Sequence, residues 1–421
     1  MDAQNPPQAS TTPSQRLLRS AILIILLLTG RLFVAHHPIP VHGDEVGFIE
    51  GIGFPAPYPV HRPGYPLWIG LGAVGTHLGL TPYISFELWS IIGSILAPVV
   101  LYRWLGQLVS DGLAWWMSLA FGVNPLVWFL SATALTYTLA LLLGIILIYS
   151  CARSLFHDDL RSARRAIITF MVCIWIRPDF LFWLSPLVIW MIWRRRGRGL
   201  IFEMVLFAVA AAGLIAFIYW LYGRDELPDT RIGDTPHWLQ SIYNTSTFRL
   251  GLVNGLLRSL TKFLGILAWV FGAVIMLIPF AAGWVLLNPP LRGLRWFFLL
   301  WTIPLTAFVL LIHMSEPGHI ILLVPAGYLF VALWLQSSTR PQYALRIASA
   351  LALFSTIQFL AYPWSTQVSG YRKTLNAKIA YLSASGLRQI DHRWDIHTPS
   401  DVWPTAMHQP TATRPAFKPP Q

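Results

Sequence analysis

The chain has 421 residues, of which 55% are hydrophobic and only 11% are charged. A soluble domain carries roughly 25% charged residues, so this composition excludes an ordinary soluble fold and indicates an integral membrane protein. The net charge of +12 does not predict nucleic-acid binding, because the basic residues form short clusters between apolar runs, as membrane topology requires.

The chain begins with a polar segment, and apolar runs then alternate with short polar connections. Residues 1–15 are rich in Pro, Ser and Thr, which predicts a disordered, cytoplasmic N-terminus. The first apolar run has no small-residue cleavage site behind it, so we expect an uncleaved span. A spanning helix needs about 20 apolar residues, and the runs predict an all-α, polytopic transmembrane bundle of about 11 spans over residues 16–362. The candidate spans are 17–35, 84–104, 112–131, 133–152, 166–178, 179–193, 199–222, 262–287, 294–313, 319–336 and 343–362.

The predicted orientation depends on one ambiguous stretch, residues 65–80. If the N-terminus is cytoplasmic and this stretch lies along the membrane, every basic cluster falls on the cytoplasmic side, as the positive-inside rule requires. If the stretch crosses, every cluster falls outside. We therefore expect a juxtamembrane or re-entrant helix within a first outer loop, 36–83. The clusters are Arg153/Arg161/Arg164/Arg165, Arg194/Arg195/Arg196/Arg198, Arg292/Arg295 and Arg340/Arg346.

The face predicted to point outward carries most of the polar chemistry. It comprises the loop 36–83, the Arg177-Pro178-Asp179 turn, the segments 223–261 and 314–318, and a partly disordered tail, 363–421.

Two adjacent carboxylates, Asp44 and Glu45, follow the first predicted span. One carboxylate can deprotonate an acceptor hydroxyl while the other binds or orients, which suits general-base chemistry. An Asp-Glu pair in a short loop is also typical of a solvated turn, and that alternative stays open. Histidines at 36, 37, 42 and 61 have irregular spacing, which favours solvated side chains at the interface over a metal site.

Basic residues on the same face are candidates for binding phosphate, because a guanidinium matches phosphate geometry. They are Arg62, Arg177 and Arg258. Arg177 and Asp179 lie between two short apolar runs, where a charged pair tends to face a cavity, although a kink with a local ion pair is the alternative. Glu316 and His319 lie in a further outward turn, which is otherwise an ordinary hairpin between spans.

These elements together resemble the polytopic glycosyltransferases of the C-type fold, which include protein O-mannosyltransferases, aminoarabinose transferases and oligosaccharyltransferases. The Gly-Tyr-Pro-Leu motif at 64–67 is closest to that of a branch related to the O-mannosyltransferases. The sequence departs from the family pattern at Arg62, where a second proline is usual, and at His319, where a tyrosine is usual. The matching motifs are Asp44-Glu45, HRPGYPL at 61–67, IRPDF at 176–180 and EPGHIILLVP at 316–325.

The resemblance implies a donor sugar carried on a polyprenyl phosphate and an inverting transfer to an acceptor protein, lipid or glycan at the outer face of the membrane. The two cysteines and the lack of a retention signal indicate the plasma (inner) membrane. Asp44 would act as the base and Glu45 would orient it. The substrate-binding residues implied are His61, Arg62, Tyr65, Arg177, Asp179, Arg258, Glu316 and His319. A single Asp-Glu pair offers too few oxygen ligands to assign a metal, so a divalent cation stays open.

Two other classes of function fit parts of the sequence. A transporter or flippase for a lipid-linked or small polar substrate would explain interrupted helices and charges inside the membrane. The chain shows no internal repeat, and its polar residues gather on one face, which argues against that reading. A non-catalytic subunit of an envelope assembly would keep the fold with an inert Asp44.

Overall fold

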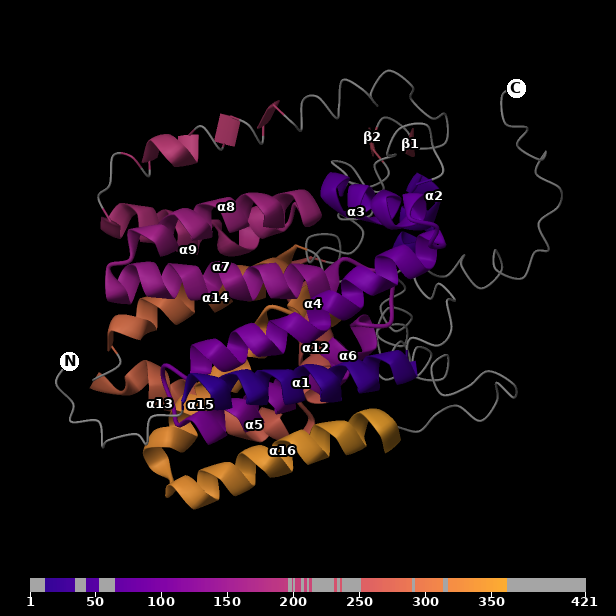
Figure 1. The fold of residues 1–421 in the computed structure, drawn as a ribbon. Helices are drawn as coiled ribbons and strands as arrows, with labels where there is room; N and C mark the ends of the chain where they lie inside the picture. The colour runs from indigo at the N-terminus through magenta and orange to yellow at the C-terminus, as the bar shows by residue number, and fades with distance from the viewer. Residues whose placement is uncertain are drawn as a thin grey trace, which may run out of the picture.

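The computed structural model describes residues 12–34, 43–52, 65–195, 199, 201–205, 208–209, 212–213, 231–232, 235–236, 251–289, 292–312 and 317–361. Long helices run side by side through this part of the chain (Figure 1). The predicted helical bundle is confirmed, and a two-residue antiparallel pair, β1 (Arg231–Ile232) with β2 (Thr235–Pro236), is added to it.

The described helices follow one another in chain order, most of them close to the predicted apolar runs. They are α1 (Pro13–Val34), α2 (Gly43–Ile52), α3 (Pro66–His77), α4 (Pro82–Leu105), α5 (Asp111–Gly122), α6 (Pro125–Leu130), α7 (Tyr137–His157), α8 (Leu160–Ile176), α9 (Phe180–Arg195), α12 (Leu252–Phe271), α13 (Leu277–Leu287), α14 (Arg292–Leu311), α15 (Leu323–Ser338) and α16 (Pro341–Ala361). Two 3₁₀ segments, η3 (Gly272–Met276) and η5 (Pro317–Ile320), complete the set.

The chain is a multi-pass membrane protein. Within the described ranges, four helices are long and apolar enough to cross a bilayer: Pro82–Leu105, Tyr137–His157, Gly293–Leu311 and Pro341–Leu360. The total of about 11 spans stays a prediction. Most of the candidate span 199–222 lies outside the described residues, as do the segments 1–11 and 362–421.

Two predicted spans are interrupted. The span expected at 112–131 is divided into α5 and α6 at Asn124-Pro125, because Pro125 has no N–H to donate to the preceding turn and pushes Asn124 into an extended conformation. The span expected at 262–287 begins ten residues earlier and is divided at Gly272, which has a φ of 49°. The last part of the segment 223–261 is the first half of α12. Its position at the outer face stays a prediction.

The short helices α2 and α3 lie together at one end of the bundle, which we call the α3 end; α1 begins at the opposite end, the far end (Figure 1). The stretch predicted as a short juxtamembrane helix forms α3 and turns back into α4. Ser85 of α4 donates its hydroxyl proton to the carbonyl of Gly72 at 2.8 Å, which fastens α3 to the start of α4.

The central helix, α4, packs against α1, α3, α5 and α7. Its approach to α7 is close at Gly93, where a Cβ atom would lie 2.6 Å from backbone atoms of Thr138 and Leu139. Nearby, Thr138 donates to the Ser90 carbonyl at 2.8 Å, and Ser90 donates to the Leu135 carbonyl at 3.0 Å. The beginning of α7 is therefore held directly against α4.

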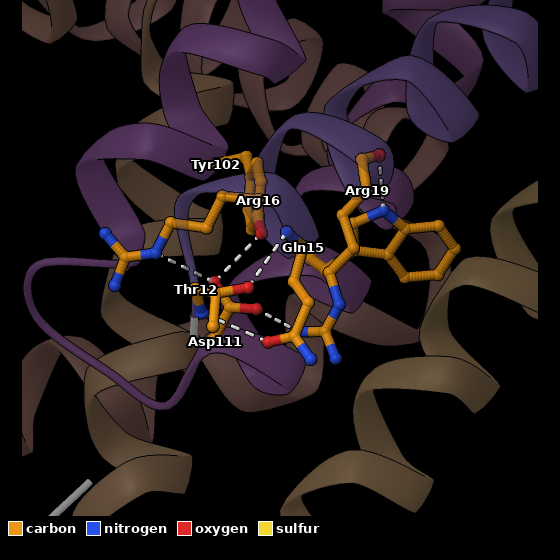
Figure 2. Close-up of polar contacts among 7 residues, drawn as sticks. Thr12, Gln15, Arg16, Arg19, Tyr102 and Asp111 are labelled. Carbon is orange, nitrogen blue, oxygen red and sulfur yellow. Dashed lines mark hydrogen bonds and ion pairs between the residues drawn. The ribbon is translucent and has the colours of Figure 1, made fainter. Parts of the chain in front are cut away.

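At the far end, one carboxylate ties α1 to α5 (Figure 2). Asp111, in the first turn of α5, forms ion pairs with Arg19 and Arg16 of α1 and accepts the Tyr102 hydroxyl at 2.8 Å. Thr12 and Gln15 exchange hydrogen bonds at 3.1 and 3.3 Å and so cap the start of α1. The carboxylate and this cap together fix where α1 begins.

The close approach of α4 to α7 predicts a strong stability effect at Gly93. A Gly93→Leu substitution forces the two backbones apart, and overpacking of this kind costs about 1–3 kcal/mol. We expect a lower Tm in detergent, measured by differential scanning fluorimetry. The control is Gly70→Ala in α3, where an added Cβ meets nothing within 4 Å. Equal Tm values for the two variants would contradict the observed packing.

Candidate functional site

A buried turn, residues 131–136, joins α6 to α7 and is the centre of the candidate site. Its backbone and side chains are almost entirely inaccessible to solvent. The amide of Ala134 donates to Glu45 Oε2 at 3.0 Å, and the hydroxyl of Thr136 accepts a hydrogen bond from Arg177 Nη1 at 2.9 Å. A carboxylate and a guanidinium that are far apart in the sequence therefore meet on one short turn.

The predicted carboxylate pair lies in the first turn of α2, not in an open loop. Acidic residues are stabilised there by the exposed amide groups of the helix N-terminus. Adjacent helical residues point in different directions: Glu45 is completely buried against the turn, while Asp44 is half-buried. The solvated-turn alternative therefore does not describe Glu45.

An aromatic cluster fixes α2 relative to α3 and α4. Phe48, one turn after Glu45, packs edge-on against Tyr65 and Trp68 at centroid distances of 5.2 and 6.4 Å. Trp68 in turn stacks on Phe86 of α4 at 5.1 Å. Tyr65, a predicted pocket residue, is thus at the start of α3 beside the helix that carries the carboxylates.

Tyr83 is a member of the site that the sequence reasoning missed. Its hydroxyl donates to the carbonyl of Ala132 at 3.2 Å, and it also contacts the carboxylate of Glu45. Nothing in the sequence distinguishes this tyrosine from others at the ends of apolar runs, because its role depends on how α4 packs against the turn.

Arg177 and Asp179 form a bidentate ion pair between α8 and α9. Arg177 donates from Nε to Oδ1 at 3.1 Å and from Nη2 to Oδ2 at 2.6 Å. The guanidinium also lies over the ring of Tyr137 at 4.1 Å and near that of Trp183 at 5.6 Å. Fork-to-fork pairing and two aromatic faces fix the orientation of this buried cation. The local ion pair predicted as an alternative at this turn is present.

His319 approaches the same group of residues from η5. Its ring packs edge-on against Tyr137 at a centroid distance of 5.9 Å, so Tyr137 contacts both His319 and Arg177. Gly318 is pressed against the Tyr137 ring, which leaves no room for a side chain at that position. The 3₁₀ turn is therefore in direct contact with the start of α7.

Two buried basic residues, Arg258 and Lys262, lie one helical turn apart on α12. Arg258 was predicted in an outer segment but belongs to a helix that packs against α6 and α14. Lys262 was missed, although a second cation four residues later in an apolar helix is a visible signal of an intramembrane polar site.

Several predicted residues lie outside the described part of the chain. His61, Arg62 and Glu316 are among them, together with the histidines at 36, 37 and 42. Among the residues that the structure describes, no group of three or more His, Cys, Asp or Glu side chains is arranged to hold a metal ion. A divalent cation therefore stays open.

Comparison with known proteins identifies the fold. No protein-family model and no curated protein matches the sequence. Among solved structures, the chain is similar to ArnT from Cupriavidus metallidurans bound to undecaprenyl phosphate, with a TM-score of 0.55 and 14% sequence identity over 96% of this chain and 82% of ArnT. The chain therefore has the fold of the C-type glycosyltransferases, as the resemblance predicted.

The ion pair of Arg177 with Asp179 predicts a large stability effect. Asp179→Ala leaves a buried guanidinium without its carboxylate, and breaking such a pair costs about 3–5 kcal/mol. The matched control is Glu203→Ala, which removes the partner of Arg164 from an ion pair at 3.0 Å with both side chains far more exposed. That loss costs about 0–1 kcal/mol. Unfolding in detergent compares the two, and equal destabilisation would contradict the buried pairing.

Proposed function

We propose that the chain is a membrane glycosyltransferase that moves a sugar from a polyprenyl phosphate to an acceptor hydroxyl. The observation that carries this proposal is the convergence of Glu45 and Arg177 on one buried turn beside Asp44. The fold shared with ArnT, whose solved structure is bound to undecaprenyl phosphate, supports a lipid-phosphate donor.

In the proposed reaction, Asp44 is the general base. Its half-buried carboxylate removes the proton of the acceptor hydroxyl while the hydroxyl oxygen bonds to the anomeric carbon of the donor. The bond between that carbon and the phosphate oxygen breaks, and the polyprenyl phosphate leaves with the electron pair. A single displacement inverts the anomeric configuration. Glu45, held by the Ala134 amide, orients Asp44 or binds the acceptor.

The leaving phosphate needs positive charge around it. We assign this role to Arg177 and Arg258 with His319, and add Lys262 because it is buried one turn from Arg258. Both oxygens of Asp179 already accept hydrogen bonds from Arg177, so a phosphate reaching this guanidinium would share it with a carboxylate. His61, Arg62, Tyr65 and Glu316 are proposed to shape the sugar pocket.

The proposed location is the plasma (inner) membrane, with the N-terminus in the cytoplasm and the α3 end at the outer face. This orientation leaves the basic clusters cytoplasmic, as the positive-inside rule requires. The donor's prenyl chain would then lie between helices within the bilayer, and its phosphate would reach the outer boundary.

A transporter or flippase is the second candidate. It is favoured by the interrupted helices: Asn124, at the break between α5 and α6, donates to the carbonyl of Val270 near the end of α12 at 2.7 Å. Discontinuous helices that meet within the membrane are typical of transporters. The carboxylates and basic residues at the α3 end favour chemistry at the membrane boundary instead.

The proposed base gives the first activity test. Membranes holding the wild type or Asp44→Asn are incubated with a panel of radiolabelled polyprenyl-phosphate sugars, and label transferred to an acceptor is counted. Removing a general base costs about 10²–10⁴-fold in rate. The control is Asp159→Asn, which changes a carboxylate that caps the first turn of α8 through Ser162.

Transfer by the wild type with loss in Asp44→Asn would support the proposal and name the sugar. Normal transfer by a well-inserted Asp44→Asn protein would remove Asp44 from the chemistry. If neither protein transfers any sugar and both are well inserted, the transporter becomes the better reading.

Lys262 predicts an effect on donor binding. Lys262→Gln removes one buried positive charge from the proposed phosphate environment, so we expect the donor KM to rise about tenfold, in line with the loss of one charged hydrogen bond. The neighbouring Thr261→Val is the control, because its exposed hydroxyl bonds the carbonyl of Leu257 within its own helix. An unchanged KM in Lys262→Gln would exclude Lys262 from the phosphate site.

A further inference from the structure

The break between α5 and α6 leaves the carbonyl of Gly122 to be satisfied from outside the helix. In an uninterrupted helix, the carbonyl of Gly122 would accept the amide of Leu126. Here the Leu126 amide instead donates to the side chain of Asn124 at 3.0 Å. Inside a membrane, a helix break is tolerated only where neighbouring groups satisfy the released backbone atoms.

The group that satisfies Gly122 is Arg31, from α1. Its Nη2 donates to the Gly122 carbonyl, and its Nε donates to the hydroxyl of Ser94 on α4 at 3.3 Å. Its guanidinium also lies 5.5 Å from the ring centre of Trp128 on α6. One side chain therefore contacts three helices beside α1, and it does so directly at the break.

Burying the charge of Arg31 costs free energy, so stabilising the contacts between helices does not by itself explain this residue. The side chain is completely buried, and its Nη1 has no hydrogen-bond partner in the described part of the chain. None of the ion pairs among the described residues includes it. A buried charge without an opposite charge beside it carries a large desolvation cost. A role of Arg31 in fixing the positions of the helices that it contacts explains this arrangement better.

Arg31 also contacts α6, through Trp128. Trp128 lies under the guanidinium and donates from its indole nitrogen to the carbonyl of Gly30 at 3.1 Å. The same ring also stacks on Phe359 of α16 at 4.5 Å. Because α6 has only six residues, fixing its beginning and its middle also fixes the 131–136 turn that follows.

We propose that Arg31 is a positioning residue for the candidate site. It caps the end of α5 and holds α6, so that the 131–136 turn presents the Ala134 amide to Glu45 and the Thr136 hydroxyl to Arg177. Its consequence for catalysis rests on the proposed glycosyl transfer; its effect on the turn does not.

A matched control exists on the same pair of helices. Arg19 ties α1 to the beginning of α5 through Asp111, and Arg31 ties α1 to the end of α5 through Gly122 (Figure 2 shows the Arg19 contact). Both are cations of α1 bound to α5, but Arg19 is at the far end, away from the turn. Arg19→Gln and Arg31→Gln therefore separate a general loss of α1–α5 contacts from an effect on the turn.

The first experiment measures exposure of the turn without any substrate. A cysteine replaces Ser131, which is buried in the turn, and its alkylation by a small maleimide is timed; the native Cys151 and Cys173 are buried, and their background is measured in the parent protein. We expect Arg31→Gln to speed alkylation at position 131 about tenfold through local opening, and Arg19→Gln to leave it unchanged. A second reporter, Ser118→Cys in α5, should stay slow in both.

Equal alkylation at position 131 in the Arg31→Gln and parent proteins would overturn the proposal. So would a parallel rise at position 118, because the bundle would then have loosened as a whole. If Arg31→Gln does not fold, Arg31→Lys and Ser94→Ala serve instead, since each removes part of the contact and keeps the charge. A smaller rise confined to position 131 supports the proposal, and no change in both variants overturns it.

The second readout is transfer activity. We expect Arg31→Gln to lower kcat with an unchanged KM for the donor, and Arg31→Lys to recover part of the loss; a change in KM alone would contradict positioning of the turn. If the wild type transfers no sugar but the exposure of position 131 still depends on Arg31, the proposed function fails and the structural assignment stands.

Discussion

The requirement that every backbone polar group inside a membrane be satisfied explains much of this structure. Pro125 divides one helix in two, and the carbonyl of Gly122 that is released there accepts a hydrogen bond from Arg31 of α1. At the same break, the side-chain amide of Asn124 donates to the carbonyl of Val270 on α12 and to the hydroxyl of Tyr328 on α15. Each of these contacts crosses between helices. The interruption is therefore also the point at which several helices are fixed relative to one another.

The geometry of the candidate site depends on this break between α5 and α6. The short turn after α6 depends on the neighbouring helices for its position. Its Ala134 amide donates to Glu45 of α2, and its Thr136 hydroxyl accepts from Arg177 at the end of α8. Tyr137 then contacts Arg177 and His319 from the first position of α7. The residues proposed for chemistry thus rest on side chains and backbone groups that take no part in it, an arrangement that holds a site more firmly than loops would.

The sequence predicted the helical bundle and most helix positions because apolar runs long enough to span a bilayer are a strong local signal. It also predicted that the carboxylates, the Arg177 turn and the segment 314–318 lie on the outer face, which stays a prediction; the structure brings Glu45 and Arg177 to the 131–136 turn and His319 to Tyr137. It missed what depends on tertiary burial: that Asp44 and Glu45 begin a helix, that α12 starts at Leu252, and that Tyr83 and Lys262 are buried beside polar groups. Arg31 stood within an apolar run, where sequence alone cannot tell a charge facing lipid from one that caps a helix.

The way in which each buried cation is satisfied separates its roles. Arg177 is bound by both oxygens of Asp179, so the net charge of the pair is close to zero. The pairing fixes the orientation of the guanidinium. Arg31 is satisfied by a carbonyl, a hydroxyl and an aromatic face, which compensate its charge only partly. A cation held in this way keeps a long-range positive field in a medium of low dielectric constant. Arg31 therefore adds, along with its contacts at the break, to the positive potential inside the bundle, in the same sense as Arg258 and Lys262.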